Sequence, residues 1–160
     1  MPAAIREPDQ ETGLPLDAIA GSWFIRATSF PMWLDGKRHR PTLNYAPGNR
    51  RLRSGLIDEV RYEQAARERV VRGFDFPSDA TNRHFLWRGS GLLTPFSSRW
   101  SIRHLDAGGE WMFIAFERTW FTPAGYDLVA RDAAMGAASV EEALSAAGAA
   151  GLDSIRILSI

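Results

Sequence analysis

Short apolar stretches alternate with turn-forming residues along most of this chain, and this rhythm constrains the fold more than any other feature. Pro-Gly, Gly-Ser-Gly and Asp-Ala-Gly-Gly clusters separate runs rich in β-branched and aromatic residues, a pattern typical of strands. The expected strands cover residues 22–29, 42–46, 56–62, 69–76, 83–88, 99–105, 111–120 and 126–131. Eight strands in hairpin order predict an all-β fold, either an up-and-down antiparallel barrel or a sandwich.

One segment near the C-terminus departs from this pattern. Ser139, followed three residues later by Glu142, has the form of a capping box, and an Ala-rich helix is expected over 139–150. Gly151 is placed to end that helix in the left-handed conformation. The alternating tail at 155–158 predicts a further short strand.

The bulk numbers exclude several classes of protein. A length of 160 residues suits one domain, expected over 14–160 after a disordered arm at 1–13. Because 19 basic side chains balance 19 acidic ones, no global charge favours nucleic acid. The chain has no Cys, which excludes disulfides and thiolate metal sites. No signal peptide and no span-length apolar run is recognisable, so a cytoplasmic location is expected.

Alternation along the expected strands predicts which side chains face the interior. The inward set is Trp23, Ile25, Ala27, Leu56, Asp58, Val60, Tyr62, Phe85, Trp87, Trp100, Ile102, His104, Tyr126 and Leu128. Asp127 is expected to face outward, as are Arg26 and Thr28. The facing of the second, fourth and seventh strands stays open. The seventh is apolar on both sides, which favours a helix packed on its outer face.

Three stretches resemble conserved parts of the lipocalin family, and its bacterial members above all. They are Gly21-Ser22-Trp23, the run from Tyr126 to Arg131, and the segment 147–158. The resemblance implies an eight-stranded barrel in which Arg131 packs over Trp23 at the closed end. It also implies that the segment Phe30–Trp33 lies across the open end as a lid. The family's Thr-Asp-Tyr before the seventh strand is absent. Another calycin barrel, of the fatty-acid-binding or nitrobindin type, is the alternative at the level of the fold.

The leading functional hypothesis is an intracellular barrel that binds a small hydrophobic or aromatic molecule. The expected ligand-binding residues are Trp33, Asp58, Tyr62, Trp87, Trp100, His104, Phe113 and Tyr126. A basic stretch, comprising Lys37, Arg38, Arg40, Arg50, Arg51 and Arg53, offers an attraction for an anionic ligand end at the mouth. A solvated loop is the simpler interpretation of that stretch.

The alternative hypothesis is a lipocalin-like isomerase, cyclase or lyase acting on a hydrophobic substrate. In that case Asp58, Tyr62 and His104 would perform acid–base chemistry in the dry interior. A third possibility is a structural protein with a filled interior. The three His residues have no ligand spacing, so no metal site is expected, and no motif indicates a cofactor.

Overall fold

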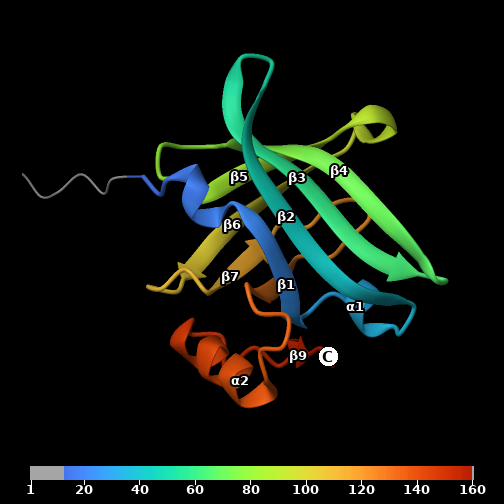
Figure 1. The fold of residues 1–160 in the computed structure, drawn as a ribbon, viewed down its shortest axis with the longest axis vertical. Coiled ribbons are helices and arrows are strands. Elements are labelled where there is room, and N and C mark those ends of the chain that lie inside the picture. Colours follow the sequence, from blue (N-terminus) through green and yellow to red (C-terminus); the bar gives the residue numbers. More distant parts are fainter. Residues whose placement is uncertain (1–12, 160) are drawn as a thin grey trace, which may run out of the picture.

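The sheet closes on itself, because the first strand pairs with both the second and the eighth (Figure 1). The computed structural model describes residues 13–159. The barrel strands are β1 (Gly21–Thr28), β2 (Arg38–Arg50), β3 (Arg53–Gln64), β4 (Arg67–Pro77), β5 (His84–Gly89), β6 (Ser97–Leu105), β7 (Trp111–Phe116) and β8 (Gly125–Ala130). Each pairs antiparallel with the next, which confirms the predicted up-and-down barrel.

Four short or medium helices and one further strand complete the described chain. They are η1 (Leu16–Ile19), α1 (Pro31–Leu34), η2 (Gly91–Leu93), α2 (Ala137–Ala146) and β9 (Arg156–Ile157). The C-terminal strand expected from the alternating tail is β9, which pairs with β1. The arm expected at 1–13 lies, apart from Gly13, outside the described residues. The division of the chain at residue 14 stays a prediction.

The predicted bounds of the C-terminal helix are wrong at both ends. Gly136 is the N-cap, and its carbonyl accepts the backbone N–H of Val140, so Ser139 lies inside the helix and forms no capping box. At the other end Gly148 has φ +73°, and the N–H of Ala149 bonds back to the carbonyl of Leu144. This is the left-handed cap that we expected at Gly151.

The strands β2 and β3 extend well beyond their predicted bounds, while β7 stops short of its own. The Pro-Gly at 47–48 is part of β2 rather than a turn, and the reversal comes at Arg51 and Leu52, which both have positive φ. β2 pairs with β1 only as far as Tyr45. Pro47 is tolerated because a strand without a neighbour on one side needs no N–H there.

Two β-bulges reverse the facing of side chains within their strands. One falls at Arg26 in β1 and the other at Arg103 in β6. Beyond each bulge the alternation is shifted by one residue, so Ala27 and His104 face outward and Thr28 faces inward. The prediction for these three side chains was therefore wrong.

Residues 13–159 form two apolar cores, one inside the barrel and one beneath α2. The inner core contains Trp23, Ile25, Leu56, Phe85 and Trp100 among others. The outer core joins Ala27, Phe113, Leu128, Val140 and Ala143, which confirms that the helix covers the outer face of β7 (Figure 1). The buried Arg26 fixes this layer, since its guanidinium donates to the carbonyls of Met135 and Leu158.

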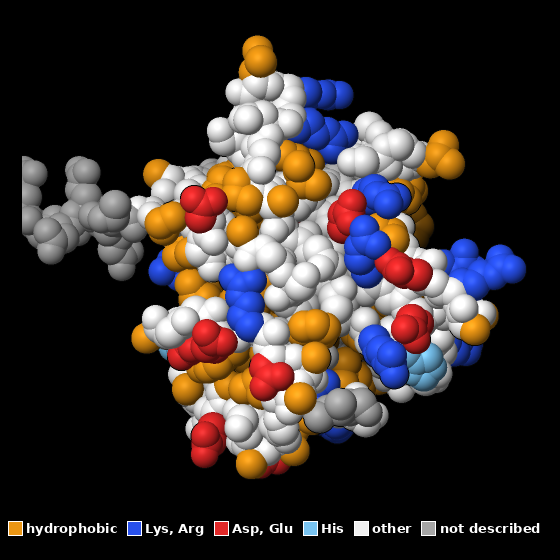
Figure 2. All heavy atoms as spheres, in the orientation of Figure 1, with side chains coloured by type: hydrophobic (Ala, Val, Ile, Leu, Met, Phe, Trp, Pro, Cys, Tyr) orange, Lys and Arg blue, Asp and Glu red, His pale blue; other side chains and the backbone are white. Residues whose placement is uncertain are grey.

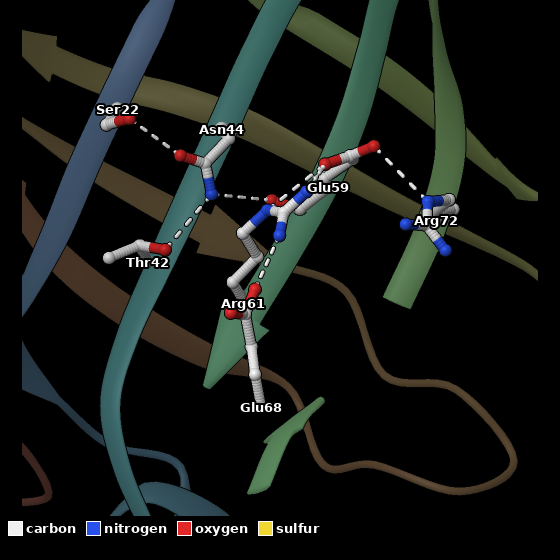
Figure 3. A network of polar contacts seen from close by, with 7 residues as sticks. All are labelled: Ser22, Thr42, Asn44, Glu59, Arg61, Glu68 and Arg72. Atoms are coloured by element: carbon white, nitrogen blue, oxygen red, sulfur yellow. Dashed lines mark hydrogen bonds and ion pairs between the residues drawn. The ribbon is translucent and has the colours of Figure 1, made fainter. Parts of the chain in front are cut away.

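Polar side chains bind the outer surface of β1 to β4 together. Asn44 accepts from Ser22 at 2.7 Å and donates to the carbonyl of Glu59, whose carboxylate pairs with Arg61 and Arg72 (Figure 3). In the same region Figure 2 shows acidic and basic side chains side by side over β3 and β4. This face is a mixed, internally paired surface rather than a basic patch.

Candidate functional site

One end of the barrel is closed by the contact that the resemblance implied. The guanidinium carbon of Arg131 lies 3.7 Å from the centre of the Trp23 ring, and its nitrogens donate to the carbonyls of Ala18 and Ala20. Trp23 is fully buried and donates from Nε1 to the carbonyl of Ile19. Gly21 is required here, because its φ is +97° and a Cβ would lie 2.9 Å from Arg131. This end is structural.

The interior above that floor contains a cavity of about 190 Å³. Its lining comes from every barrel strand and from α1, and is chiefly aromatic and aliphatic. The lining residues are Ile25, Phe30, Met32, Trp33, Leu43, Tyr45, Asp58, Val60, Val71, Trp87, Ser98, Trp100, Phe116, Glu117, Thr122 and Asp127. None of these is a Lys, Arg or His.

The segment at 30–33 forms the cover of this cavity. Pro31 occupies the first turn of α1, where its missing N–H has no cost, and the helix turns Met32 and Trp33 toward the cavity. Trp33 meets Tyr62 edge-to-face with centroids 5.4 Å apart. The ring of Phe30 lies over Gly125, where a Cβ would come within 2.5 Å of it. The segment thus supplies the side chains expected of it at the cavity.

Stacked aromatic rings form another part of the cavity wall. The Trp100 ring stacks on Tyr45, with centroids 5.5 Å apart and planes at 15°, and on Phe85, with centroids 4.5 Å apart and planes at 21°. The Trp100 indole also donates from Nε1 to Oδ1 of Asp75 at 2.9 Å. Trp87 packs flat against Gly73, where a Cβ would lie 2.2 Å from its Nε1. The positions of these rings therefore depend on strand pairing, on one hydrogen bond to Trp100 and on the space that Gly73 leaves for Trp87.

Three buried carboxyl groups point into this apolar interior. Asp58 on β3, Asp75 on β4 and Asp127 on β8 are each at most 5 % exposed. Each has one carboxylate oxygen without a hydrogen-bond donor in the described chain. These unpaired oxygens are Oδ1 of Asp58, Oδ2 of Asp75 and Oδ1 of Asp127. Buried polar atoms are seldom left this way.

Burial makes these acids hold their protons to unusually high pH. Burial raises the pKa of Asp58 to about 6, against a hydrogen bond with Asp75 that lowers it. Burial, together with the charge of Asp58, raises the pKa of Asp75 well above its usual value. Burial also raises the pKa of Asp127 to about 7, although a hydrogen bond with Thr28 opposes the shift.

The phenol of Tyr45 marks the place where the acids converge. Tyr45 is directly opposite Asp58 in the β2–β3 pairing. Burial raises its pKa well above the usual value, and the charges of Asp58, Asp75 and Asp127 raise it further. The three acids and Tyr45 therefore influence one another electrostatically within the same aromatic interior.

The structure brings together half of the predicted ligand-binding residues. Trp33, Asp58, Trp87 and Trp100 line the cavity. Tyr62 faces inward as predicted but packs behind Trp33 and does not line it.

His104, Phe113 and Tyr126 lie outside the barrel. The inward facing predicted for His104 and Tyr126 was wrong, and Phe113, on a strand whose facing was left open, does not line the cavity. His104 pairs with Phe113 and stacks on Trp111 at 5.0 Å, because the bulge at Arg103 shifts its side chain outward. Phe113 and Tyr126 stack on each other beneath α2, and Leu128 belongs to the same outer core. The predicted set of Asp58, Tyr62 and His104 is thus not assembled in one place.

Tyr45, Asp75 and Asp127 were not among the predicted site residues. Asp127 was placed outside because charge was assumed to mark the wet face, yet it pairs with the inward-facing Ile114. Asp75 lies between two phenylalanines, Phe74 and Phe76. An acid between two aromatics in a strand is a usable signal that one face carries a buried charge.

The predicted basic stretch does not reach the cavity. Arg38 pairs with Asp35 and Arg40 with Glu63, while Arg50 donates to the carbonyls of Arg88 and Gly89. None of the six basic residues lines the cavity, so an anionic ligand end at the mouth lacks support. Within residues 13–159, no cluster of His, Cys, Asp and Glu has the form of a metal site. Nor does that range contain a helix of the length and apolarity that a bilayer crossing demands.

Comparison with solved structures identifies the fold. Apocrustacyanin C1 matches with a TM-score of 0.62 at 12 % identity, over 88 % of this chain and 76 % of that one. The siderocalin Ex-FABP, which functions through dual ligand specificities, matches with a TM-score of 0.62 at 14 % sequence identity, over 89 % of this chain and 95 % of that one. Insecticyanin from the tobacco hornworm Manduca sexta matches with a TM-score of 0.63 at 8 % sequence identity, over 96 % of this chain and 85 % of that one. No protein-family model and no curated protein matches the sequence. The chain has the lipocalin fold.

Proposed function

We propose that this lipocalin-fold chain binds a small, largely apolar molecule in the cavity behind α1. The observation that carries the proposal is the aromatic-lined cavity of about 190 Å³ inside the closed sheet. Eight-stranded barrels are just wide enough to hold one small ligand. An apolar cavity of roughly 150 Å³ accepts benzene, so this one suits a single ring with a short substituent. The cytoplasmic location expected from the sequence stays a prediction.

The test is calorimetry and Trp fluorescence with 2-phenylethanol as the probe. We expect saturable binding with one site per chain. Val60→Trp fills the cavity from β3 and is expected to abolish binding. The matched control is Ile57→Trp on the same strand, because Ile57 faces outward and is 47 % exposed. If neither 2-phenylethanol nor another single-ring compound saturates, or if Val60→Trp binds like Ile57→Trp, the proposed function is wrong.

A second candidate function, proton-transfer catalysis, is favoured by one specific observation. Asp58 and Asp127 line the largely apolar cavity, and burial raises their pKa values to about 6 and about 7, close to neutrality. Groups poised in this way serve as general acids and bases. The acid–base residues would then be Asp58, Asp75 and Asp127, in place of the predicted set containing Tyr62 and His104.

This candidate is tested by deuterium exchange from D₂O into the methylene group of 1-phenylpropan-2-one. Catalysis requires exchange faster than in buffer, and a loss of that excess rate in Asp127→Asn. An exchange rate equal to that of buffer leaves binding as the function.

A further inference from the structure

The charges around the cavity are of one sign, and this restricts the ligand more than its volume does. The acids that line it are Asp58, Asp127 and the exposed Glu117. Asp75 does not line the cavity, but it accepts a hydrogen bond from Trp100, which does. No Lys, Arg or His lines the cavity within the described residues. An anionic or strongly electron-rich ligand would meet repulsion from every charged group there.

The unpartnered oxygen of Asp127 shows where a donor is missing. Asp127 is 2 % exposed, it lines the cavity, and its Oδ1 accepts no hydrogen bond from the described chain. A buried carboxylate oxygen without a partner is costly to leave in that state. An N–H donor on the ligand would satisfy it, and a charged donor would do so best.

The walls favour a cation as well. Tyr45, Trp87 and Trp100 line the same cavity, and aromatic rings attract positive charge. The remaining lining is apolar, which suits a hydrocarbon ring rather than a hydrated inorganic ion.

We propose that the cavity binds a protonated arylalkylamine, a single aromatic ring on a short chain that ends in an ammonium group. The ring packs among Trp33, Trp87 and Trp100, and the ammonium group lies toward the carboxylates that surround Tyr45. This deepens the binding function proposed above and rests on it. No covalent chemistry is involved.

Binding of the amine is linked to pH in a direction that the structure fixes. The titratable groups facing the ammonium site are Tyr45 on β2, Asp58 on β3, Asp75 on β4, Asp127 on β8 and Glu117 beyond β7. Burial raises the pKa of Asp127 to about 7, so its carboxyl group is mostly protonated below that pH. The bound ammonium requires the carboxylate, so binding below this pH releases a proton. Affinity therefore rises with pH until the amine itself loses its proton.

The experiment compares three probes that share one ring: 2-phenylethylamine, 2-phenylethanol and 3-phenylpropanoate. Calorimetry at pH 7.5 is expected to give the order amine, alcohol, acid, with the amine about tenfold tighter than the alcohol or more. Between pH 5.5 and 7.5 the affinity for the amine rises, by up to about tenfold per pH unit, while that for the alcohol does not. Titrations in buffers of different ionisation enthalpy measure the released proton directly.

Two isosteric variants test the assigned residues. Asp127→Asn and Asp58→Asn each remove a charge without changing shape, and each is expected to weaken the amine about tenfold while the alcohol still binds. Asp153→Asn, which removes an exposed acid near the C-terminus, is the control and keeps wild-type affinity. Circular dichroism confirms that the variants fold.

The outcomes separate this inference from the function on which it rests. If the alcohol binds as well as the amine, or the acid binds best, the amine proposal fails and the binding function stands. The same holds if both Asn variants bind the amine like wild type. If none of the three probes binds, both proposals fail.

Discussion

The indole Nε1 of Trp100 donates a hydrogen bond of 2.9 Å to Oδ1 of Asp75 in the interior of the barrel. Both residues are buried, and burial together with the charge of Asp58 raises the pKa of Asp75 well above its usual value. One hydrogen bond thus joins the aromatic wall of the cavity to a buried acid. It fixes the plane of the Trp100 ring, which a ligand would contact, and it partly compensates a buried acid.

Trp100→Phe tests this bond. The side chain stays aromatic but loses the indole N–H donor and part of its volume, so we expect the free energy of unfolding to fall by about 1–3 kcal/mol. The control is Trp120→Phe, since Trp120 is 99 % exposed and its substitution should be nearly neutral. Urea denaturation at pH 7 measures both. Equal stabilities for the two variants would show that the bond contributes nothing.

Stability of the ligand-free protein is expected to fall as pH rises from about 4 to 7. Burial raises the folded-state pKa of Asp127 to about 7, whereas the unfolded chain titrates near 3.8. Across this window the folded state binds more protons than the unfolded state, so deprotonation favours unfolding. A pKa shift of this size corresponds to about 4 kcal/mol in the free energy of unfolding. Asp58 and Asp75 act in the same direction.

Denaturant unfolding at pH 5 and pH 8 measures that dependence, and Asp127→Asn is expected to flatten it. Because the amide carries no charge to desolvate, the variant should be the more stable protein at pH 8. A variant that is less stable than wild type at pH 8 would contradict the assignment of Asp127 as a buried, uncompensated acid.

Gly73→Ala is expected to disturb the cavity wall. The new Cβ would lie 2.2 Å from Nε1 of Trp87 and 2.6 Å from the carbonyl oxygen of Arg88. Since one of these is backbone, the strand must shift, at a cost of about 1–3 kcal/mol. Thermal unfolding measures the loss, and a change in Trp emission reports the displaced ring. Gly151→Ala, where a Cβ meets nothing within 4 Å, serves as the neutral comparison.

Arg131→Ala is expected to destabilise the closed end without touching the cavity. It removes the contact with Trp23 and the hydrogen bonds to Ala18 and Ala20, together worth about 2–3 kcal/mol. Arg99→Ala removes an exposed arginine and should cost little. Affinity for 2-phenylethanol at a temperature where both variants are folded should match wild type. A loss of affinity would place the floor within the binding site.

The outward facing of His104 can be tested by binding. His104→Ala is expected to leave the affinity for 2-phenylethanol within about twofold, because the side chain stacks on Trp111 outside the barrel. Trp87→Ala, on the cavity wall, should weaken binding about tenfold. A larger loss of affinity in His104→Ala than in Trp87→Ala would mean that His104 contacts the ligand, and it would contradict the outward facing that the bulge at Arg103 produces.

Local sequence signals determined much of the barrel. Turn clusters and alternation placed all eight strands, and the resemblance to the lipocalin family at Gly21, Trp23 and Arg131 implied which end is closed. The inward facing of Leu56, Asp58, Val60, Tyr62, Phe85, Trp87 and Trp100 also followed from alternation alone. This succeeded because a regular strand repeats every two residues, and the period is a local property of the backbone.

Tertiary structure decided the rest, and the physical reason is the same at each place. The bulges at Arg26 and Arg103 each insert one residue into the pairing with a neighbouring strand. Because that pairing depends on the partner strand, the local sequence does not predict the bulge. Asp127 faces inward because Ile114 opposite it does, and not because of its own polarity. The buried acids come from β3, β4 and β8, which only closure of the sheet brings together. The sequence determined eight strands with aromatic inward faces; closure into a barrel with three acids inside it was decided by the tertiary structure.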